Sequence, residues 1–293
     1  MGKVVVVGSL NCDLVMRVER LPSEGETVGA LGFETFVGGK GCNQAIAAAR
    51  AGADVSMVGC VGDDEYGSVI LEALSGAGVD AARVRRAQSG TGVAQIFVDR
   101  RGANVVGVAP RANGELSAAD VEAARSSIQD SAVLLLQLEI PLETAVAAAR
   151  VARSAGTKVV LNPAPMRERS PALSTLLGLV DVLIPNETEA ARLAGYAGVP
   201  TVIVTLGGRG ALLREAGKPP QAIDPFSVDV VDTTAAGDAF CGAFAASLAG
   251  GANAHAAARW ATAAGALACT RMGAEPSLPH RPAIERLLAT QGT

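Results

Sequence analysis

The stretch Val231-Asp232-Thr233-Thr234-Ala235-Ala236-Gly237-Asp238 has the pattern of a strand end, a tight turn of small residues and the first turn of a helix. We expect the strand to end at Val231 and the helix to begin near Gly237. The first N–H groups of a helix have no partner within it and lie at the positive end of its dipole. The turn therefore predicts an anion-binding site whose small side chains let a phosphate approach the backbone.

Asp238 stands beside this turn, where an acidic group is not needed for anion binding. Its position predicts a general base aimed at a hydroxyl that attacks phosphorus. At the start of a helix its carboxylate should have a lowered pKa, which suits late proton transfer. The alternative is an acid that only stabilises the first helical turn.

A second stretch lies far upstream, at Phe36-Val37-Gly38-Gly39-Lys40-Gly41-Cys42-Asn43-Gln44. It is another glycine turn that opens an alanine-rich helix, with Lys40 and Asn43 one turn apart and able to face one ligand. Together the two stretches resemble the motifs of the ribokinase (PfkB-type) carbohydrate kinase family. The resemblance runs from about Lys3 to about Leu287.

The resemblance implies an α/β fold with a doubly wound, mostly parallel sheet flanked by helices, and a small β-sheet lid. It implies ATP-dependent phosphorylation of a sugar, with the 5-hydroxyl of D-ribose expected to attack and ribose 5-phosphate as product. The alternatives within the family are deoxyribose, hexose and nucleoside kinases. An alternative from another class is a sugar-binding regulator without activity.

Composition excludes several classes of protein. The 293 residues are 49% hydrophobic, enough for a sizeable core, and the net charge of −4 includes no basic run for nucleic acid or an anionic membrane. No apolar stretch is long enough to span a bilayer, and no signal-peptide layout precedes the first strand, so a cytoplasmic protein is expected. Five cysteines without metal-ligand spacing are expected to be reduced thiols: Cys12, Cys42, Cys60, Cys241 and Cys269.

The order of expected elements indicates one α/β domain over residues 1–293. The β-branched run at residues 3–8 predicts a strand buried on both faces. Strands expected at 132–137, 157–162 and 181–184 alternate with helices, which is typical of a doubly wound sheet with ligands at the carboxyl ends of its strands. The connection at 194–200 is shorter than in ribokinases.

Two less apolar segments, about 14–37 and 91–108, are expected to form the lid. The second contains a predicted hairpin around Arg100-Arg101-Gly102. A lid has a physical purpose, because transfer to a sugar must exclude water. Its exposed edge predicts a homodimer. Arg111, near the lid's end, occupies a place where glycine is expected.

Sugar ligands are expected after the first strand, where Asn11 and Asp13 lie two residues apart and can point to the same side. Taken alone, each could simply form an Asx turn, and Glu139 could be an ordinary loop acid. The resemblance instead implies sugar-hydroxyl contacts from a set of seven residues: Asn11, Asp13, Gly39, Lys40, Asn43, Glu139 and Asp238.

The nucleotide and metal sites are implied mostly by the resemblance. Asn186 and Glu189 have the spacing of a capping box, but they also match the family motif associated with Mg²⁺ and ATP phosphates. Glu189 is the expected Mg²⁺ residue. The implied anion hole is Ala235, Ala236 and Gly237, and the implied ATP contacts are Asn186, Thr205, Leu206, Gly207, Gly208, Arg209, Gly210, Gly237 and Thr262.

A monovalent cation, K⁺, is also implied, as an activator that touches neither substrate. The anion turn has no long side chains to hold it, so oxygen ligands behind it would keep its N–H groups aimed. The alternative is that Asp232 only bonds the turn's own N–H groups. The residues carried over for the cation are Asp232, Thr234, Ala268, Arg271, Gly273 and Ser277.

Overall fold

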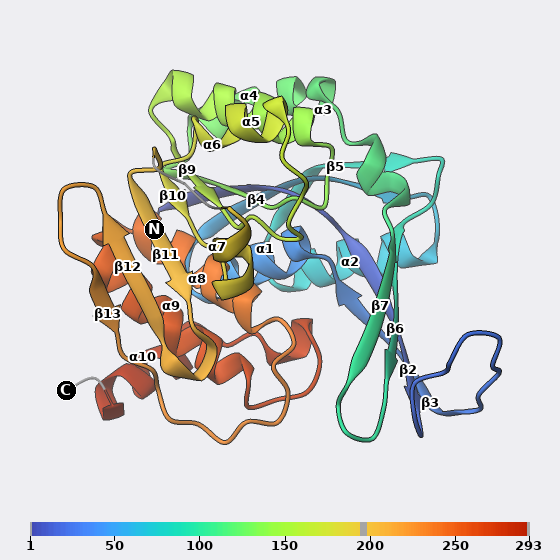
Figure 1. The fold of residues 1–293 in the computed structure, drawn as a ribbon. Helices are drawn as coiled ribbons and strands as arrows, with labels where there is room; N and C mark the ends of the chain where they lie inside the picture. The colour runs from blue at the N-terminus through green and yellow to red at the C-terminus, as the bar shows by residue number, and fades with distance from the viewer. Residues whose placement is uncertain (1, 194–197, 292–293) are drawn as a thin grey trace.

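The computed structural model describes residues 2–193 and 198–291. Its main sheet has nine strands within these residues, in the order β13-β12-β11-β10-β9-β8-β1-β4-β5 (Figure 1). Neighbours pair in parallel except at β11–β12 and β12–β13. The strands are β1 (Lys3–Val7), β4 (Asp54–Gly62), β5 (Asp80–Ala87), β8 (Val133–Leu136), β9 (Lys158–Leu161), β10 (Val182–Leu183), β11 (Thr201–Thr205), β12 (Ala211–Glu215) and β13 (Gln221–Ile223).

Strand β1 lies inside the sheet, and its sequence explains why. Val4 and Val6 belong to the core on one face of the sheet, and Val5 and Val7 belong to the core on the other. All four are at most 2% exposed. A run of valines satisfies both faces at once, as a strand covered on both sides requires, and this confirms the expected mostly parallel α/β fold.

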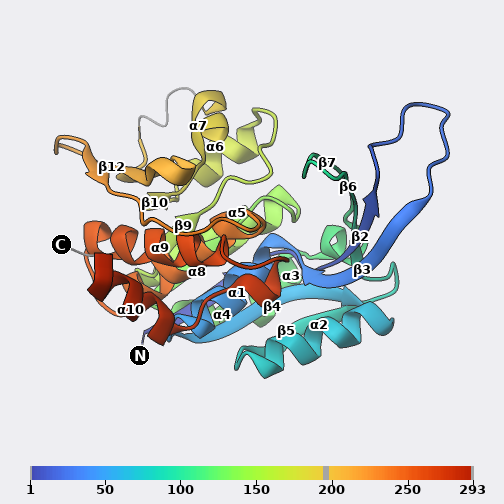
Figure 2. The same cartoon turned by 90° about the horizontal axis from the view of Figure 1, so that it is seen from below.

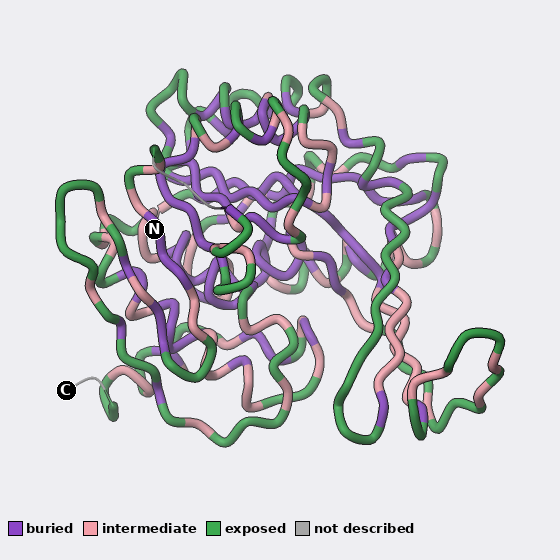
Figure 3. The backbone as a smooth tube through the Cα atoms, in the orientation of Figure 1, coloured by how far each residue is buried: buried purple, intermediate pink, exposed green. Residues whose placement is uncertain are grey.

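Helices cover both faces of the main sheet, so the molecule has three layers (Figures 1 and 2). One layer holds α1 (Lys40–Arg50), α2 (Glu65–Gly76), α8 (Ala236–Ala249), α9 (Ala254–Ala268) and α10 (Arg281–Gln291). The other holds α3 (Ala118–Ala123), α4 (Arg125–Gln129), α5 (Leu142–Ala155) and α6 (Pro171–Leu177). Buried residues are concentrated in the main sheet and along the helices that pack against it (Figure 3). In the described residues no helix is both long and apolar enough to cross a membrane.

Helices α1 and α8 pack very closely, and a glycine allows it. A Cβ atom on Gly242 of α8 would lie 2.5 Å from the carbonyl oxygen of Gln44 in α1. Real Cβ atoms do not approach that closely, so the helices could not pack this way with a larger residue. This contact brings the N-terminal turns of α1 and α8 together. The two stretches that carry the sequence resemblance therefore meet.

A second sheet of four strands projects from the main body, at the lower right of Figure 1. Its order is β3-β2-β6-β7, from β2 (Asn11–Val18), β3 (Ala30–Gly38), β6 (Gly92–Val98) and β7 (Asn104–Ala109). These strands fall within or just beside the segments 14–37 and 91–108. Strands β2 and β6 are far apart in sequence but pair in parallel.

Arg111 departs from the glycine expected at its place, and the backbone there is strained. Its φ is +44°, in the left-handed region that glycine adopts without strain. Two contacts hold it: its Nε donates to the carbonyl oxygen of Ser89 at 2.9 Å, and the next N–H, of Ala112, donates to that of Gly90 at 2.9 Å.

The expected strand ending at Val231 is wrong. Residues 224–231 form no strand, and Val230 and Val231 are 64% and 59% exposed. The N–H of Val231 donates instead to the carbonyl oxygen of Cys269, at the end of α9. The valines suggested a strand, but no neighbouring strand pairs with them. Part of the 194–200 connection lies outside the described residues.

Arg50 ends α1 and fixes the loop that follows α9. Its Nη1 donates to the carbonyl oxygens of Glu275 at 2.7 Å and Leu278 at 3.1 Å, and its Nη2 pairs with the Glu275 carboxylate. Helix α1 therefore has Lys40 at one end and this loop at the other.

Candidate active site

Asp238 lies in the first turn of α8 and is only 8% exposed. Two amides hold its carboxylate. Asn43 Nδ2 donates to Oδ2 at 3.0 Å, and Gln44 Nε2 donates to Oδ1 at 2.9 Å. Ala235 precedes the helix with φ +59°, a left-handed conformation that an alanine adopts only at a cost. The turn before α8 is thus held in an unusual shape beside a buried carboxylate.

The pKa of Asp238 is raised, which corrects the lowered value expected from its place in the helix. Burial is the main cause, because it disfavours the charged form. The Lys40 ammonium and the donors on Gln44 and Asn43 lower the pKa but do not offset burial, and Glu139 raises it further. A carboxylate with a raised pKa is a better proton acceptor than the expected one.

Three further amides near Asp238 were missed by the sequence reasoning: Gln44, Gln137 and Asn162. Gln44 Nε2 also donates to Asn162 Oδ1 at 3.1 Å, and Gln137 Nε2 donates to Gln44 Oε1 at 2.7 Å. Gln44 and Gln137 are both 0% exposed. The available signal was Gln137 within the apolar run Leu134-Leu135-Leu136-Gln137-Leu138, because a polar residue in a buried strand end needs a partner.

On the expected sugar side, Asn11 is oriented by Asn113. Asn113 accepts from the N–H of Leu10 at 2.8 Å, and its Nδ2 donates to Asn11 Oδ1 at 2.7 Å. Gly92 leaves room for this pair, since a Cβ there would lie 2.3 Å from both amides. With its oxygen engaged, Asn11 has its NH₂ group available as a donor.

Asp13 and Glu139 lie on the same side. Burial, and then the nearby Glu139 and Asp238, raise the pKa of Asp13 to about 7. Glu139 Oε2 accepts from the N–H of Lys40 at 3.0 Å and from Ser9 Oγ at 2.5 Å. The carboxylate of Glu139 therefore binds the N-terminus of α1, a contact that its sequence position did not reveal.

A cavity of about 140 Å³ joins the glycine-lysine helix to the anion turn. It brings together seven of the predicted site residues with four further ones, Asn162, Ala164, Ile184 and Cys241. The predicted residues are Lys40, Asn186, Glu189, Thr205, Ala235, Gly237 and Asp238.

On the expected nucleotide side, Asn186 and Glu189 form a complete capping box at the start of α7 (Glu187–Arg192), with reciprocal bonds of 2.8 and 2.9 Å. Burial raises the pKa of Glu189, against opposing effects of the Asn186 N–H and Lys40. The glycine turn follows at η2 (Gly207–Arg209). Gly210, with φ +83°, has no room for a Cβ beside the Ile223 carbonyl oxygen.

Thr262 is not among the residues that line the cavity of Asp238. It is 8% exposed, and its hydroxyl donates to the carbonyl oxygen of Ala258 in its own helix at 2.8 Å.

Asp232 joins the anion turn to the loop after α9. Its Oδ1 accepts from the N–H and hydroxyl of Thr234, at 2.9 and 2.7 Å, and its Oδ2 accepts from the N–H of Gly273 at 2.9 Å. Asp232, Thr234 and Gly273 also line a cavity of about 530 Å³ with Asp13 and other residues of the small sheet. The small sheet therefore faces the turn.

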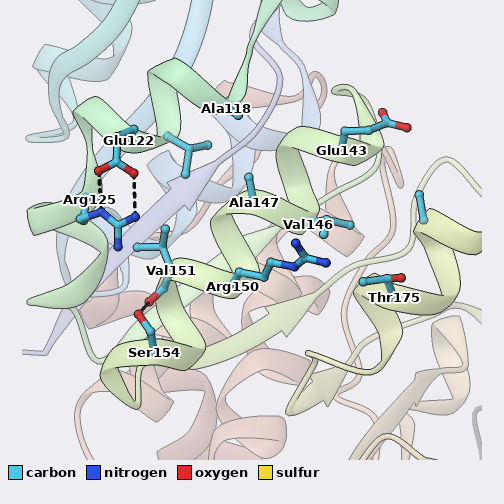
Figure 4. A pocket seen from close by; sticks show the side chains of 12 residues that line it. Ala118, Glu122, Arg125, Glu143, Val146, Ala147, Arg150, Val151, Ser154 and Thr175 are labelled. Carbon is cyan, nitrogen blue, oxygen red and sulfur yellow. Dashed lines mark hydrogen bonds and ion pairs between the residues drawn. The ribbon is translucent and has the colours of Figure 1, made fainter.

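A separate cavity of about 650 Å³ lies in the outer helical layer, lined from α3, α4, α5 and α6 (Figure 4). Its charged groups include the Glu122–Arg125 ion pair and Arg150. It contains none of the predicted site residues. Size alone does not identify a functional site. The smaller cavity is the candidate site because it contains the buried carboxylate of Asp238 with polar groups converging on it.

Known proteins resemble the chain over nearly its whole length. The family model described as pfkB family carbohydrate kinase matches residues 1–281. The chain is similar to ribokinases of Haemophilus influenzae, 38% identical over 296 residues, and Schizosaccharomyces pombe, 39% over 306 residues, with 95% of each chain covered.

Solved structures of ribokinases are also similar to this chain over nearly its whole length. The ribokinase of Thermotoga maritima superimposes with a TM-score of 0.91 at 34% identity, covering 99% of this chain and 100% of that one. The ribokinase of Arabidopsis thaliana, solved with ribose and ATP, gives 0.88 at 36%, covering 98% of both. With the two sequence motifs meeting at one buried carboxylate, the chain belongs to the pfkB family of carbohydrate kinases.

Proposed function

We propose that this carbohydrate kinase uses ATP to phosphorylate the 5-hydroxyl of D-ribose. The observation that carries the proposal is the Asp238 carboxylate, buried at the N-terminus of α8 and held by two amide donors. Ribokinase relatives support ribose as the sugar, and the Arabidopsis enzyme solved with ribose and ATP supports the nucleotide. A regulator that only senses sugar has no need of a buried base beside an anion turn.

The sugar would lie between the lid and α1, with Asn11, Asp13, Gly39, Lys40, Asn43 and Glu139 as its contacts. One atom supports this directly. Asn43 Oδ1 is buried and has no hydrogen-bond partner among the described residues. A buried acceptor without a partner is costly, and a sugar hydroxyl would satisfy it.

In the reaction, Asp238 would accept the proton of the 5-hydroxyl as that oxygen attacks the terminal phosphorus of ATP. The N–H of Gly237 and the Lys40 ammonium would stabilise negative charge on the transferred group. The N–H of Ala236 would join them by giving up its 3.3 Å bond to the carbonyl oxygen of Thr233. The base contributes about 10²- to 10⁴-fold, and positioning and charge stabilisation supply the rest. The proposed nucleotide contacts are Asn186, Thr262 and the turn from Thr205 to Gly210.

Mg²⁺ would neutralise part of the phosphate charge when ATP is bound. Glu189 fits this ion, because its half-buried carboxylate lines the cavity of Asp238 and carboxylate oxygen is a ligand that Mg²⁺ prefers. Its capping-box bond to the Asn186 N–H engages Oε2.

We also propose the monovalent cation behind the turn, with Asp232, Thr234, Ala268, Arg271, Gly273 and Ser277 supplying oxygen atoms. The set fits a hard cation, because carboxylate, hydroxyl and main-chain oxygens are its preferred ligands. Asp232 supports the placement, since it already joins the turn to the later loop. Ordering these oxygens would keep the N–H groups of the turn aimed at phosphate.

The small sheet is proposed as a lid and as the interface of a homodimer. Its edge strands β3 and β7 expose Leu31, Phe33, Val105, Val106 and Val108, each by 49% to 58%. Apolar side chains gathered on projecting strands favour burial against a second copy. All five cysteines are free thiols, in keeping with a proposed cytoplasmic location.

The test is ADP release measured with a coupled assay and a panel of ribose, 2-deoxyribose, fructose and adenosine. The proposal expects ribose to give the highest kcat/KM. A higher value for another member would replace ribose as substrate. Ribose that binds without any turnover would indicate the regulator instead.

A further inference from the structure

Gln44 and Gln137 bring two long polar side chains into the core, beside the reacting carboxylate. Gln44 comes from α1, and Gln137 follows β8, so their pairing joins two elements 93 residues apart. Neither is exposed. Neither lines the cavity in which Asp238 lies, so their effect on chemistry must pass through the side chains that they touch.

Hydrogen-bond polarity fixes the orientation of both amides. An ionised carboxylate can only accept, so Gln44 must present its NH₂ group to Asp238 Oδ1, and the same group reaches Asn162 Oδ1. The oxygen of Gln44 then faces Gln137, which must present its own NH₂ group. The series of bonds therefore starts at Asp238 and determines both glutamines.

The far end of this series is not satisfied. Gln137 Oε1 is buried and has no partner among the described residues. It lies over Gly8, where a Cβ would be only 2.0 Å away. A buried acceptor without a partner costs free energy. The arrangement therefore favours the ionised form of Asp238, while the unpaired Gln137 Oε1 lowers the stability of the fold.

We propose that Gln44 is a positioning residue for Asp238 and that Gln137 fixes the amide polarity of Gln44. With Asn43 on Oδ2 and Gln44 on Oδ1, both carboxylate oxygens are held and the plane of the group is set. The inference rests on the proposed function, in which Asp238 accepts the sugar proton.

Loss of the Gln44 donor would leave Asp238 Oδ1 without this bond, so that only Asn43 would hold the group, and would make the carboxylate easier to protonate. Hydrogen bonds from Gln44 and Asn43 both favour the ionised carboxylate. The charged groups that act on Asp238 include Lys40, Glu139 and Asp13, and the titratable Glu189 and Cys241 line the same cavity. They stay in place when Gln44 is replaced, so a change in the pH profile reports the missing amide.

The experiment compares kcat, the KM for ribose, the pH profile of kcat/KM and Tm in four variants. Gln44→Met removes the donor while keeping a long side chain, and Gln44→Glu keeps the shape while reversing the polarity. Gln44→Met combined with Gln137→Leu removes both amides. Thr157→Val is the control. It removes a buried hydroxyl that donates to the carbonyl oxygens of Ile128 and Ser131, at the end of β9 away from Asn162 and Asp238.

We expect Gln44→Met to lower kcat about tenfold, part of what a base contributes, with the KM for ribose changed less than about twofold. The acidic limb of its profile should move to higher pH. Gln44→Glu should be worse at neutral pH and recover as pH rises, because two adjacent carboxyls share a proton. The double variant should keep the low kcat while regaining Tm relative to Gln44→Met, because it leaves no amide of Gln137 unpaired.

Thr157→Val should lower Tm without changing kcat. Normal kcat in Gln44→Met, or a kcat that recovers together with Tm in the double variant, would show a purely structural role and overturn the inference. An unsubstituted protein that does not phosphorylate ribose would instead refute the proposed function, and the inference with it.

Discussion

Asp238→Asn should separate stability from catalysis. The substitution keeps the size of the side chain, but an amide cannot accept the proton of the sugar hydroxyl. If the base contributes about 10²- to 10⁴-fold, kcat should fall by that factor, which corresponds to about 3 to 5 kcal/mol in the barrier. The KM values for ribose and ATP should change little, because Asp238 acts mainly in the transition state.

The neighbouring amides can accommodate the new group. The substituted amide would bring an NH₂ group against the donors of Asn43 and Gln44. In the sugar-free protein Asn43 Oδ1 has no partner among the described residues and can turn to accept it, and ribose binding would turn it back. Burial raises the pKa of Asp238, so ionising it disfavours the folded state once the pH is above the unfolded value. The variant should therefore match or exceed the Tm of the parent at about pH 8, and this gain should disappear near pH 4.

The measurements are ADP release at saturating ribose and ATP, ribose binding by calorimetry, and Tm across the pH range. A loss of less than about tenfold in kcat would refute the assignment of the base. A large loss of ribose binding would show that Asp238 mainly holds the sugar. A lower Tm at the alkaline end of the range would contradict the burial argument.

Three further predictions concern the surrounding residues. Because the pKa of Asp13 is about 7, its carboxylate becomes protonated as the pH falls below that value. The KM for ribose should therefore rise below about pH 7, and Asp13→Asn should abolish that pH dependence. A parallel change in the KM for ATP would contradict the assignment of Asp13 to the sugar site. The same raised pKa means that ionising Asp13 destabilises the fold as pH rises towards 7 and above, so Asp13→Asn should have a higher Tm than the parent at about pH 8 but not near pH 4. At fixed ionic strength, K⁺ should give faster turnover than Na⁺ or a bulky quaternary ammonium ion, and Asp232→Ala should remove the difference; equal rates with all three cations would exclude the site.

Much of the fold could be predicted because its signals are local. The valines of β1, the glycine turn before α1 and the turn of small residues before α8 each identify an element from adjacent residues. Strand β5 could not be identified in this way because, at the edge of the sheet, only Ala87 is buried and its arginines hide the pattern. The valines before Asp232 mislead in the opposite direction: they suggest a buried strand, but Val230 and Val231 are exposed to solvent.

The site was predicted less completely because its properties depend on burial and on distant partners. The pKa of Asp238 could not be judged from its helical position, since burial outweighs the effects that lower it. Gln44 stands beside the predicted Asn43, yet its role depends on Asp238, which is 194 residues away in sequence. Such contacts form only after the sheet has brought the strand ends together.

Helix α1 has a mechanical consequence. It is about 16 Å long and rigid. Lys40 at one end lines the cavity of Asp238, and Arg50 at the other grips the backbone at Glu275 and Leu278. The same loop is bonded through Gly273 to Asp232 and so to the anion turn. The helix, the loop and the turn are thus connected in series, and Lys40 at one end and the anion turn at the other both line the cavity of Asp238. A substitution at Arg50, which lies far from the proposed substrate sites, would weaken the support of α1 and of the anion turn at the same time. Its effect on activity would therefore resemble that of a substitution in the active site itself.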